Sequence, residues 1–120
     1  MDIIYNGHAS FTLENDGYSI TVDPWVNTAF FGSWHPFPDN RICKDRILKS
    51  NSILMSHEHE DHCDLELLKE FKGNIYIPKY RSDSFCKKLA ASGIRYTEIK
   101  PRHKHNLGPF SIEFVMMDGD

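Results

Sequence analysis

Hydrophobic and polar residues alternate along the beginning of the chain in the pattern of antiparallel strands. Residues 1–7, MDIIYNG, form a short apolar segment, and residues 9–15, ASFTLEN, alternate with a period of two. A third segment of this kind, residues 18–23, follows the pair Asp16 and Gly17. Because both residues of this pair tolerate the positive φ angles of a type I′ turn, the pair is a strong hairpin signal. The chain is therefore predicted to open with an antiparallel meander.

Segments of strand length alternate with segments of helical spacing in the rest of the chain. The predicted helices are residues 44–49, 65–72 and 82–93, and the predicted strands are residues 52–56, 74–78, 94–100 and 110–117, with a polar turn at 101–108. Asp64 and Ser82 are the predicted N-caps of the second and third helices, and Gly73 and Gly93 are their predicted C-caps. Such alternation predicts helices packed on a mixed sheet, an α/β (α+β) fold.

The segment between the meander and the first predicted helix, residues 24–40, is rich in aromatic residues and prolines and has no regular period. It is predicted to be a long loop. Loops of this length serve either as lids and binding loops or as an apolar plug over the edge of the core, and the sequence leaves both interpretations open. The predicted contact residues of the loop are Trp25, Phe30, Phe31 and Trp34.

Length and composition limit the classes of protein to consider. A chain of 120 residues with 40% hydrophobic residues can bury one core, so residues 1–120 are predicted to form one domain or part of one. The formal net charge of -3, with no basic block, argues against nucleic acid as a partner. No apolar run approaches the roughly 20 residues that cross a bilayer, which predicts a cytoplasmic protein with no membrane partner. The three cysteines share no CxxC spacing and indicate reduced thiols.

The densest polar cluster directly follows the predicted strand 52–56. Here His57, His59, Asp61 and His62 form the pattern H-x-H-x-D-H. Histidines two positions apart on an extended segment point to the same side and can bind one cation, while the aspartate and the last histidine can bind a second. Imidazoles mixed with a carboxylate suit zinc, manganese or iron. The alternatives are solvated loop residues and a structural zinc site, although cysteine usually dominates structural sites.

The motif HEHEDH resembles the signature of the metallo-β-lactamase-fold hydrolase superfamily. The opening stretch, IIYNGHASFTLENDGYSITVDPWV, is similar to the start of the branch that contains lactonase-like and CMP-sialic-acid-hydroxylase-like members. In that branch a Gly-His-Ala turn precedes a hairpin and an Asp-Pro-Trp follows it. The resemblance covers nearly the whole chain. It implies the N-terminal half of a four-layer αββα sandwich, with a mixed sheet flanked by helices.

The resemblance also implies which residues hold metal. His57 and His59 match the ligands of a first metal, and Asp61 and His62 match the ligands of a second. Zinc is the expected cation, as one or two ions, with Mn²⁺ or Fe²⁺ as alternatives.

Four further residues are expected around the metals. Asp23 matches an aspartate at a strand end that supports the site from behind. His8 matches a histidine near the pocket mouth, and a histidine that is hydrogen-bonded within its own turn is the alternative for this residue. Trp25 and Trp34 of the aromatic loop are expected in the pocket.

The implied reaction is metal-assisted hydrolysis of an ester, lactone, amide or phosphodiester of a small molecule. A bound metal lowers the pKa of water from about 15.7 toward about 7, which supplies the nucleophile. Asp61 would hold or deprotonate that nucleophile and is the expected catalytic residue.

The end of the chain departs from the family pattern, because the family takes further ligands from segments beyond the signature. Residues 110–120 look like the strand that delivers the third ligand, with Asp118 or Asp120 as candidates. His103 and His105 precede this strand and are predicted turn residues. The chain is therefore expected to be the N-terminal part of a longer hydrolase, and to pair with the missing half or with itself. The alternatives are a dimerising metal-binding module without turnover and a small enzyme completed across a symmetric dimer.

Overall fold

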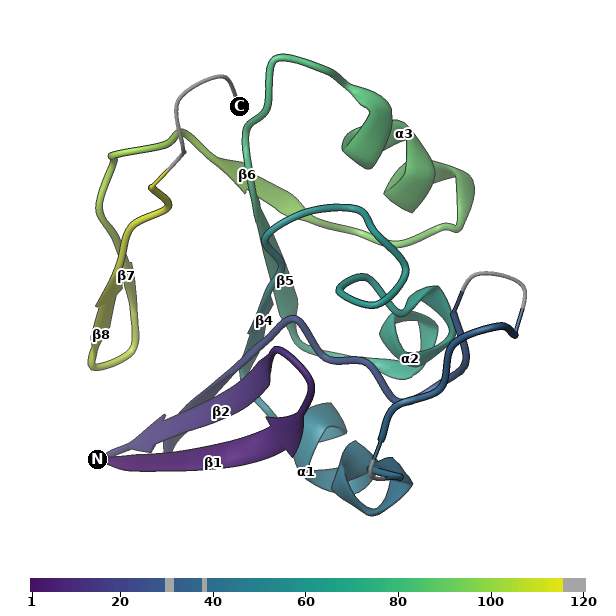
Figure 1. The fold of residues 1–120 in the computed structure, drawn as a ribbon. Coiled ribbons are helices and arrows are strands. Elements are labelled where there is room, and N and C mark those ends of the chain that lie inside the picture. The colour runs from purple at the N-terminus through teal and green to yellow at the C-terminus, as the bar shows by residue number, and fades with distance from the viewer. Residues whose placement is uncertain (30–31, 38, 116–120) are drawn as a thin grey trace.

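The computed structural model describes residues 1–29, 32–37 and 39–115, and its centre is a six-stranded mixed sheet in the order β1-β2-β3-β4-β5-β6 (Figure 1). The strands of this sheet are β1 (Asp2–Gly7), β2 (Ser10–Asn15), β3 (Tyr18–Val22), β4 (Ser52–Leu54), β5 (Asn74–Pro78) and β6 (Thr97–Ile99). The first three strands pair antiparallel, and β3 to β6 pair parallel. The predicted mixed sheet and the predicted opening meander are both confirmed.

The turn between β2 and β3 has the backbone that its sequence predicts. Asp16 and Gly17 both adopt positive φ, at 50° and 76°, and Asn15 pairs with Tyr18 across the hairpin. The turn is therefore a two-residue connection that fixes the register of β2 on β3.

The helices cover one face of the sheet (Figure 1). They are the 3₁₀ turn η1 (Arg41–Cys43), α1 (Lys44–Leu48), α2 (Leu65–Glu70) and α3 (Ser84–Ala91). Apolar side chains from the helices and from one face of β4 and β5 form the larger core cluster. Its fully buried members include Ile47, Ile53, Leu67, Ile77 and Leu89.

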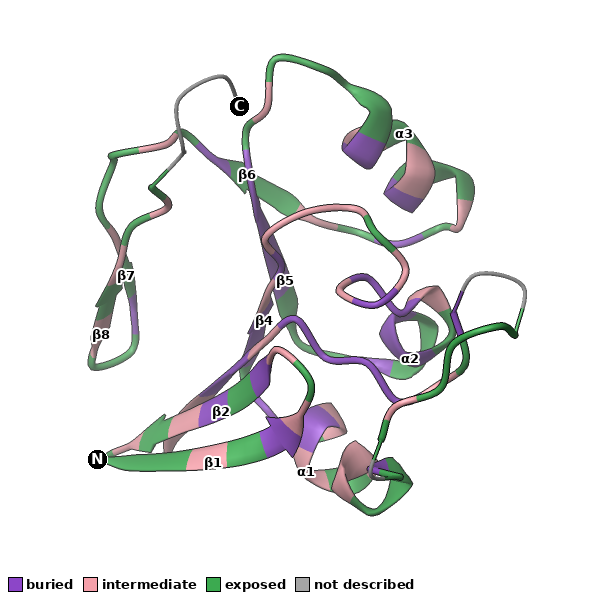
Figure 2. Cartoon of the chain, in the orientation of Figure 1, coloured by how far each residue is buried: buried purple, intermediate pink, exposed green. Residues whose placement is uncertain are grey.

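The opposite face of the sheet is covered only in part by the hairpin of β7 (His105–Leu107) and β8 (Phe110–Ile112) (Figure 1). Leu107 joins Ile20 and Tyr76 in a smaller core cluster on this face. Over β1 and β2 the same face is open, and the exposed strand β1 is visible in Figure 2. Large apolar side chains are exposed there.

Two predictions about the ends of helices are wrong. Gly73 is not the C-cap of α2, because the helix ends at Glu70 and Phe71 turns the chain into extended backbone. A Cβ at Gly73 would lie 2.5 Å from the Asn51 carbonyl oxygen, so close packing explains this glycine. Ser82 is not the N-cap of α3, because Asp83 holds that position; the Ser82 hydroxyl accepts from the amide of Ser84, the first residue of the helix.

The C-terminal segment is also different from its prediction. Residues 105–107 lie in the predicted polar turn but form β7, because they pair in register with β8. The last strand was expected at residues 110–117, whereas β8 ends at Ile112. Residues 116 and 117 of that prediction lie outside the described residues. In the part of the chain that the structure describes, no helix is long and apolar enough to cross a membrane.

Candidate metal centre

The predicted site residues gather at one edge of the sheet because three strands run toward it. β1 and β3 are both antiparallel to β2, and β4 is parallel to β3, so the carboxyl ends of β1, β3 and β4 lie at the same edge. His8, Asp23 and Ser56 follow these three ends in the sequence. Ligands of sheets with parallel strands bind beyond the carboxyl ends, so the topology places the cluster where a functional site is expected.

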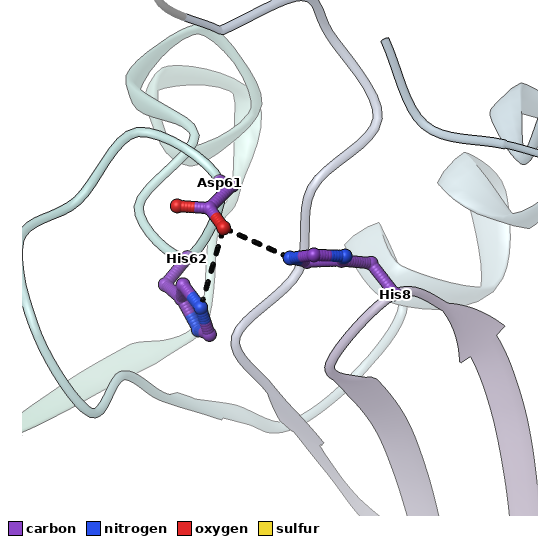
Figure 3. Close-up of side chains that lie close together, drawn as sticks. All are labelled: His8, Asp61 and His62. Carbon is purple, nitrogen blue, oxygen red and sulfur yellow. Dashed lines mark hydrogen bonds and ion pairs between the residues drawn. The ribbon is translucent and has the colours of Figure 1, made fainter. Parts of the chain in front are cut away.

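His8, Asp61 and His62 form a tight cluster at this edge (Figure 3). Each offers one ligand atom, and these atoms all lie within 4.8 Å of one another. The His8 Nε2 atom lies 2.9 Å from Asp61 Oδ2, and His62 Nε2 lies 3.5 Å from the same oxygen. The His8 side chain therefore does not bond only within its own turn. It reaches residues 57–62, which carry the HEHEDH motif and are called the ligand loop below.

Asp23 holds this cluster from the sheet side. Its carboxylate accepts hydrogen bonds from the Ser56 amide at 2.7 Å, from the Ser56 hydroxyl at 2.6 Å and from His62 Nδ1 at 3.0 Å. Asp23 is buried and has a φ of 42°, and His8 has a φ of 52°. Left-handed backbone in residues other than glycine is costly and concentrates at functional sites, which agrees with the position of both residues.

These hydrogen bonds define which imidazole nitrogens face the site. The Ser56 hydroxyl donates its proton to Asp23, so it accepts from His57 Nδ1 at 2.8 Å. His62 Nδ1 donates to Asp23 in the same way. The neutral forms of His57 and His62 therefore present unprotonated Nε2 atoms. Metal-binding histidines are oriented by this kind of partner on the other ring nitrogen, so the residues fit a divalent cation.

The imidazole rings of the ligand loop lie against one another. The His57 ring centroid is 4.0 Å from that of His62 and 4.8 Å from that of His59. Burial, followed by the positive charge that His62 would carry, lowers the pKa of His57. A lower pKa favours the neutral imidazole, which is the form that binds metal. His59 is exposed, and its carbonyl oxygen accepts from the amides of His62 and Cys63 to close the loop.

Asp61 is held in its ionised form. Burial by itself would raise the pKa of this carboxyl group, but the hydrogen bond from His8 and the nearby charge of His62 outweigh burial. The pKa of Asp61 therefore lies below its ordinary value. The cluster thus combines an anionic oxygen with two imidazoles, a donor set that suits zinc, iron or manganese.

The aromatic loop contributes an apolar wall to the site. Trp25 is buried, and its ring makes an edge contact with the His8 ring at a centroid distance of 4.9 Å. The buried Trp25, Val26 and Ala29 show that the start of the loop is an apolar plug. Trp34 is half exposed, and its backbone pairs with that of Ala29.

Two histidines that were predicted to be turn residues lie outside the cluster of His8, Asp61 and His62, and four predicted residues lie outside the described part of the chain. His103 and His105 belong to the turn before β7 and to β7 itself, and the His105 ring contacts Tyr76. The predicted residues that lie outside the described ranges are Phe30, Phe31, Asp118 and Asp120.

Several residues that the sequence analysis missed hold the ligand loop in place. The Glu58 carboxylate accepts from the Ser84 hydroxyl at 2.6 Å, and its carbonyl oxygen accepts from Lys88 Nζ at 2.7 Å. The Tyr80 hydroxyl donates to the Ser56 carbonyl oxygen. Helix α3 and the segment before it therefore hold in place Ser56, directly before the ligand loop, and Glu58 within it. No signal in the sequence points to these contacts, because each joins residues far apart in the chain.

Comparison with known proteins identifies the relatives of this chain. A family model described as the beta-lactamase superfamily domain matches residues 2–118. A protein of Mycolicibacterium smegmatis named as a Rieske 2Fe-2S iron-sulfur protein is 35% identical over 115 residues, which are 91% of this chain and 22% of that protein. A UPF0173 metal-dependent hydrolase of Desulforamulus reducens is 29% identical over 117 residues, which are 96% of this chain and 45% of the relative. The chain thus spans less than half the length of these relatives.

A solved structure supports the same fold. The crystal structure of CmlA, a diiron β-hydroxylase from Streptomyces venezuelae, matches 88% of this chain and 22% of that chain with a TM-score of 0.63 and 23% sequence identity. The likeness shows a shared backbone arrangement. The fold expected from the HEHEDH motif is therefore confirmed.

Proposed function

This chain belongs to the beta-lactamase superfamily, and from that premise we propose that it forms the metal-ligand part of a metal-dependent hydrolase. The observation that carries the proposal is the convergence of His8, Asp61 and His62, whose ligand atoms lie within 4.8 Å of one another. A relative named as a metal-dependent hydrolase covers nearly this whole chain and supports the same reaction class.

The residues of the ligand loop are proposed to bind two metal ions. His57 and His59 are the proposed ligands of one ion, and Asp61 and His62 are the proposed ligands of a second, with His8 beside them. Zinc is the proposed cation because a carboxylate and several imidazoles without cysteine are typical of its catalytic sites. Iron is the alternative cation. It should be tested because CmlA, which has a similar fold, is a diiron enzyme.

The proposed reaction is hydrolysis of a small ester, lactone, amide or phosphodiester. A bound cation supplies a water of lowered pKa and polarises the attacked oxygen. Asp61, ionised at neutral pH and hydrogen-bonded to His8, is placed to accept a proton. Asp23 keeps His62 in the tautomer that leaves Nε2 unprotonated. The Trp25 ring packs edge-on against the His8 ring and so helps to position it.

A second candidate function is a metal-binding module without turnover that pairs with another chain. The open sheet face over β1 and β2, with its exposed apolar side chains, favours it. The two functions share the metal site and differ in whether the site turns over substrate.

Elemental analysis combined with an esterase assay tests the proposal. We expect one or two zinc or iron ions per chain, hydrolysis of 4-nitrophenyl esters, and loss of both in His57→Ala. His103→Ala removes an exposed histidine outside the site and is the matched control. Bound metal without hydrolysis supports the module, and a metal-free wild-type chain contradicts both functions.

A further inference from the structure

A cavity of about 680 Å³ opens beside His57 and His59, the two histidines assigned to the first ion. Its walls come from the ligand loop, from residues 78–85 and from the chain that follows β8. A cavity of this size holds a small organic molecule. The proposed metal centre therefore adjoins a space in which a substrate can lie.

Part of the lining of this cavity is apolar. Pro78 and Phe85 are buried, Phe114 is half-buried, and Val115 is exposed at the rim. An aliphatic or aromatic group placed here would bury apolar surface, which favours binding. This part of the lining fits the hydrocarbon part of a ligand.

The rest of the lining is polar and includes one cation, Arg81, that has no counterion among the described residues. Arg81 lines the cavity and, within the described ranges, makes no ion pair or hydrogen bond, whereas Arg41 is paired with a carboxylate at 2.6 Å. Glu58, the carboxylate of the lining, accepts from the Ser84 hydroxyl at 2.6 Å and is held there. Ser82 also belongs to this part of the lining. The Arg81 guanidinium thus lines the cavity and has no hydrogen-bond acceptor among the described residues.

We propose that this cavity binds an amphipathic small molecule with a carboxylate or phosphate group, and that Arg81 binds this anionic group. The planar fork of a guanidinium matches two oxygens of either anion. Because His57 and His59 line the same cavity, a molecule held by Arg81 and the apolar lining lies next to the proposed ligands of the first ion. The inference rests on the proposed hydrolase function and specifies its substrate class as anionic esters, lactones or amides.

Equilibrium binding measured by NMR titration tests Arg81 separately from turnover. The probes are 4-phenylbutyrate, its neutral amide 4-phenylbutyramide, and phenyl phosphate, each titrated into the wild type, Arg81→Gln and Arg95→Gln. Arg95 is exposed and absent from the cavity lining, so its variant loses the same charge elsewhere. We expect at least one of the two anions to bind about tenfold or more tightly than the amide, because hydrogen bonds to charged groups are strong.

The two arginine variants show whether Arg81 itself causes the preference for an anion. The preference for an anion should disappear in Arg81→Gln and persist in Arg95→Gln. The relative affinities of the carboxylate and the phosphate distinguish the two possible anionic groups. Equal affinity of all three probes for the wild type overturns the inference. So does a preference that survives in Arg81→Gln but disappears in His57→Ala, because that pattern assigns the anion to bound metal.

Measurements of ester hydrolysis test the anion site and the hydrolase function separately. With an active protein, the ratio of kcat/KM for 4-nitrophenyl hydrogen glutarate to that for neutral 4-nitrophenyl butyrate should fall about tenfold in Arg81→Gln and stay unchanged in Arg95→Gln. If neither ester is hydrolysed but Arg81 still governs anion binding, the hydrolase proposal fails and the anion site stands. If both esters are hydrolysed with an unchanged ratio, the hydrolase proposal stands and the anion site fails.

Discussion

The His8 Nε2 atom lies 2.9 Å from Asp61 Oδ2, although the two residues are 53 positions apart in the sequence. The contact joins the turn after β1 to the ligand loop after β4. It also lowers the pKa of Asp61 against the opposing effect of burial. This hydrogen bond therefore joins His8 to the cluster and, together with the nearby charge of His62, favours the anionic form of the Asp61 carboxylate.

The first prediction concerns removal of His8. In His8→Ala the Asp61 carboxylate loses its hydrogen-bond partner, so zinc affinity at pH 7.5 should fall by about 10- to 100-fold. Competition with a chromophoric zinc chelator measures the change. His103→Ala, which removes an exposed histidine of the turn before β7, should bind zinc as the wild type does. Wild-type affinity in His8→Ala would show that this histidine neither binds nor orients the metal.

The second prediction concerns Asp23, which accepts hydrogen bonds from both Ser56 and His62. Asp23→Asn keeps the size of the side chain and tolerates the positive φ, but an amide group cannot accept from all three donors. We expect zinc affinity to fall by about 10- to 100-fold while the far-ultraviolet circular dichroism spectrum is unchanged. Unchanged affinity would mean that the orientation of His62 does not depend on Asp23.

The third prediction concerns Asp64, which joins helix α2 to the start of the aromatic loop. Its carboxylate accepts from the amides of Leu67, Val26 and Asn27 and from the Asn27 side chain. Asp64→Ala should lower the free energy of unfolding by roughly 2–4 kcal/mol, because a helix cap is lost and buried donors are left unpaired. Urea denaturation measures this change. Glu66→Ala, at an exposed position of the same helix, should stay within about 0.5 kcal/mol of the wild type.

The local elements of this fold follow from the sequence because their causes are local. The alternation in β2 and β3 and the positive φ of Asp16 and Gly17 depend on neighbouring residues. The N-cap role of Asp64 was predicted for the same reason and is confirmed. Contacts between distant segments leave no such pattern. Neither the second role of Asp64, which binds the loop start, nor the partner of His8 could be predicted from spacing.

In the candidate site, too, local features could be predicted from the sequence and contacts between distant segments could not. The ligand types and their spacing are visible in the loop itself, and their assignment to metals stays a prediction. The tautomers of His57 and His62 depend on Ser56 and Asp23, which only the parallel pairing of β3 and β4 brings together. The pairing of β7 with β8 was missed because His105 and its neighbours are polar and lack strand alternation.

The fourth prediction concerns Cys63, which directly follows the metal-ligand cluster. Burial raises the pKa of this thiol to about 11 from 9.0. Between pH 9 and pH 11 the unfolded chain loses the thiol proton while the folded chain keeps it, so stability falls as pH rises through this range. As pH rises through this range, the free energy of unfolding of the wild type should fall by roughly 1 kcal/mol per pH unit more than that of Cys63→Ala. Urea midpoints at pH 8, 9 and 10 measure the difference, and parallel pH profiles would contradict it.

The fifth prediction concerns the open sheet face over β1 and β2. Ile3, Tyr5 and Phe11 are 63%, 58% and 41% exposed, and Tyr5 pairs with Phe11 across the two strands. Because neighbouring exposed apolar side chains favour association, we expect the chain to self-associate as its concentration rises. The double variant Ile3→Lys and Phe11→Lys should shift sedimentation toward the monomer. Ile42→Lys, which removes a 91% exposed apolar residue from η1, should not. A wild-type chain that stays monomeric at high concentration contradicts the prediction, and an equal shift in Ile42→Lys would assign association to apolar exposure in general.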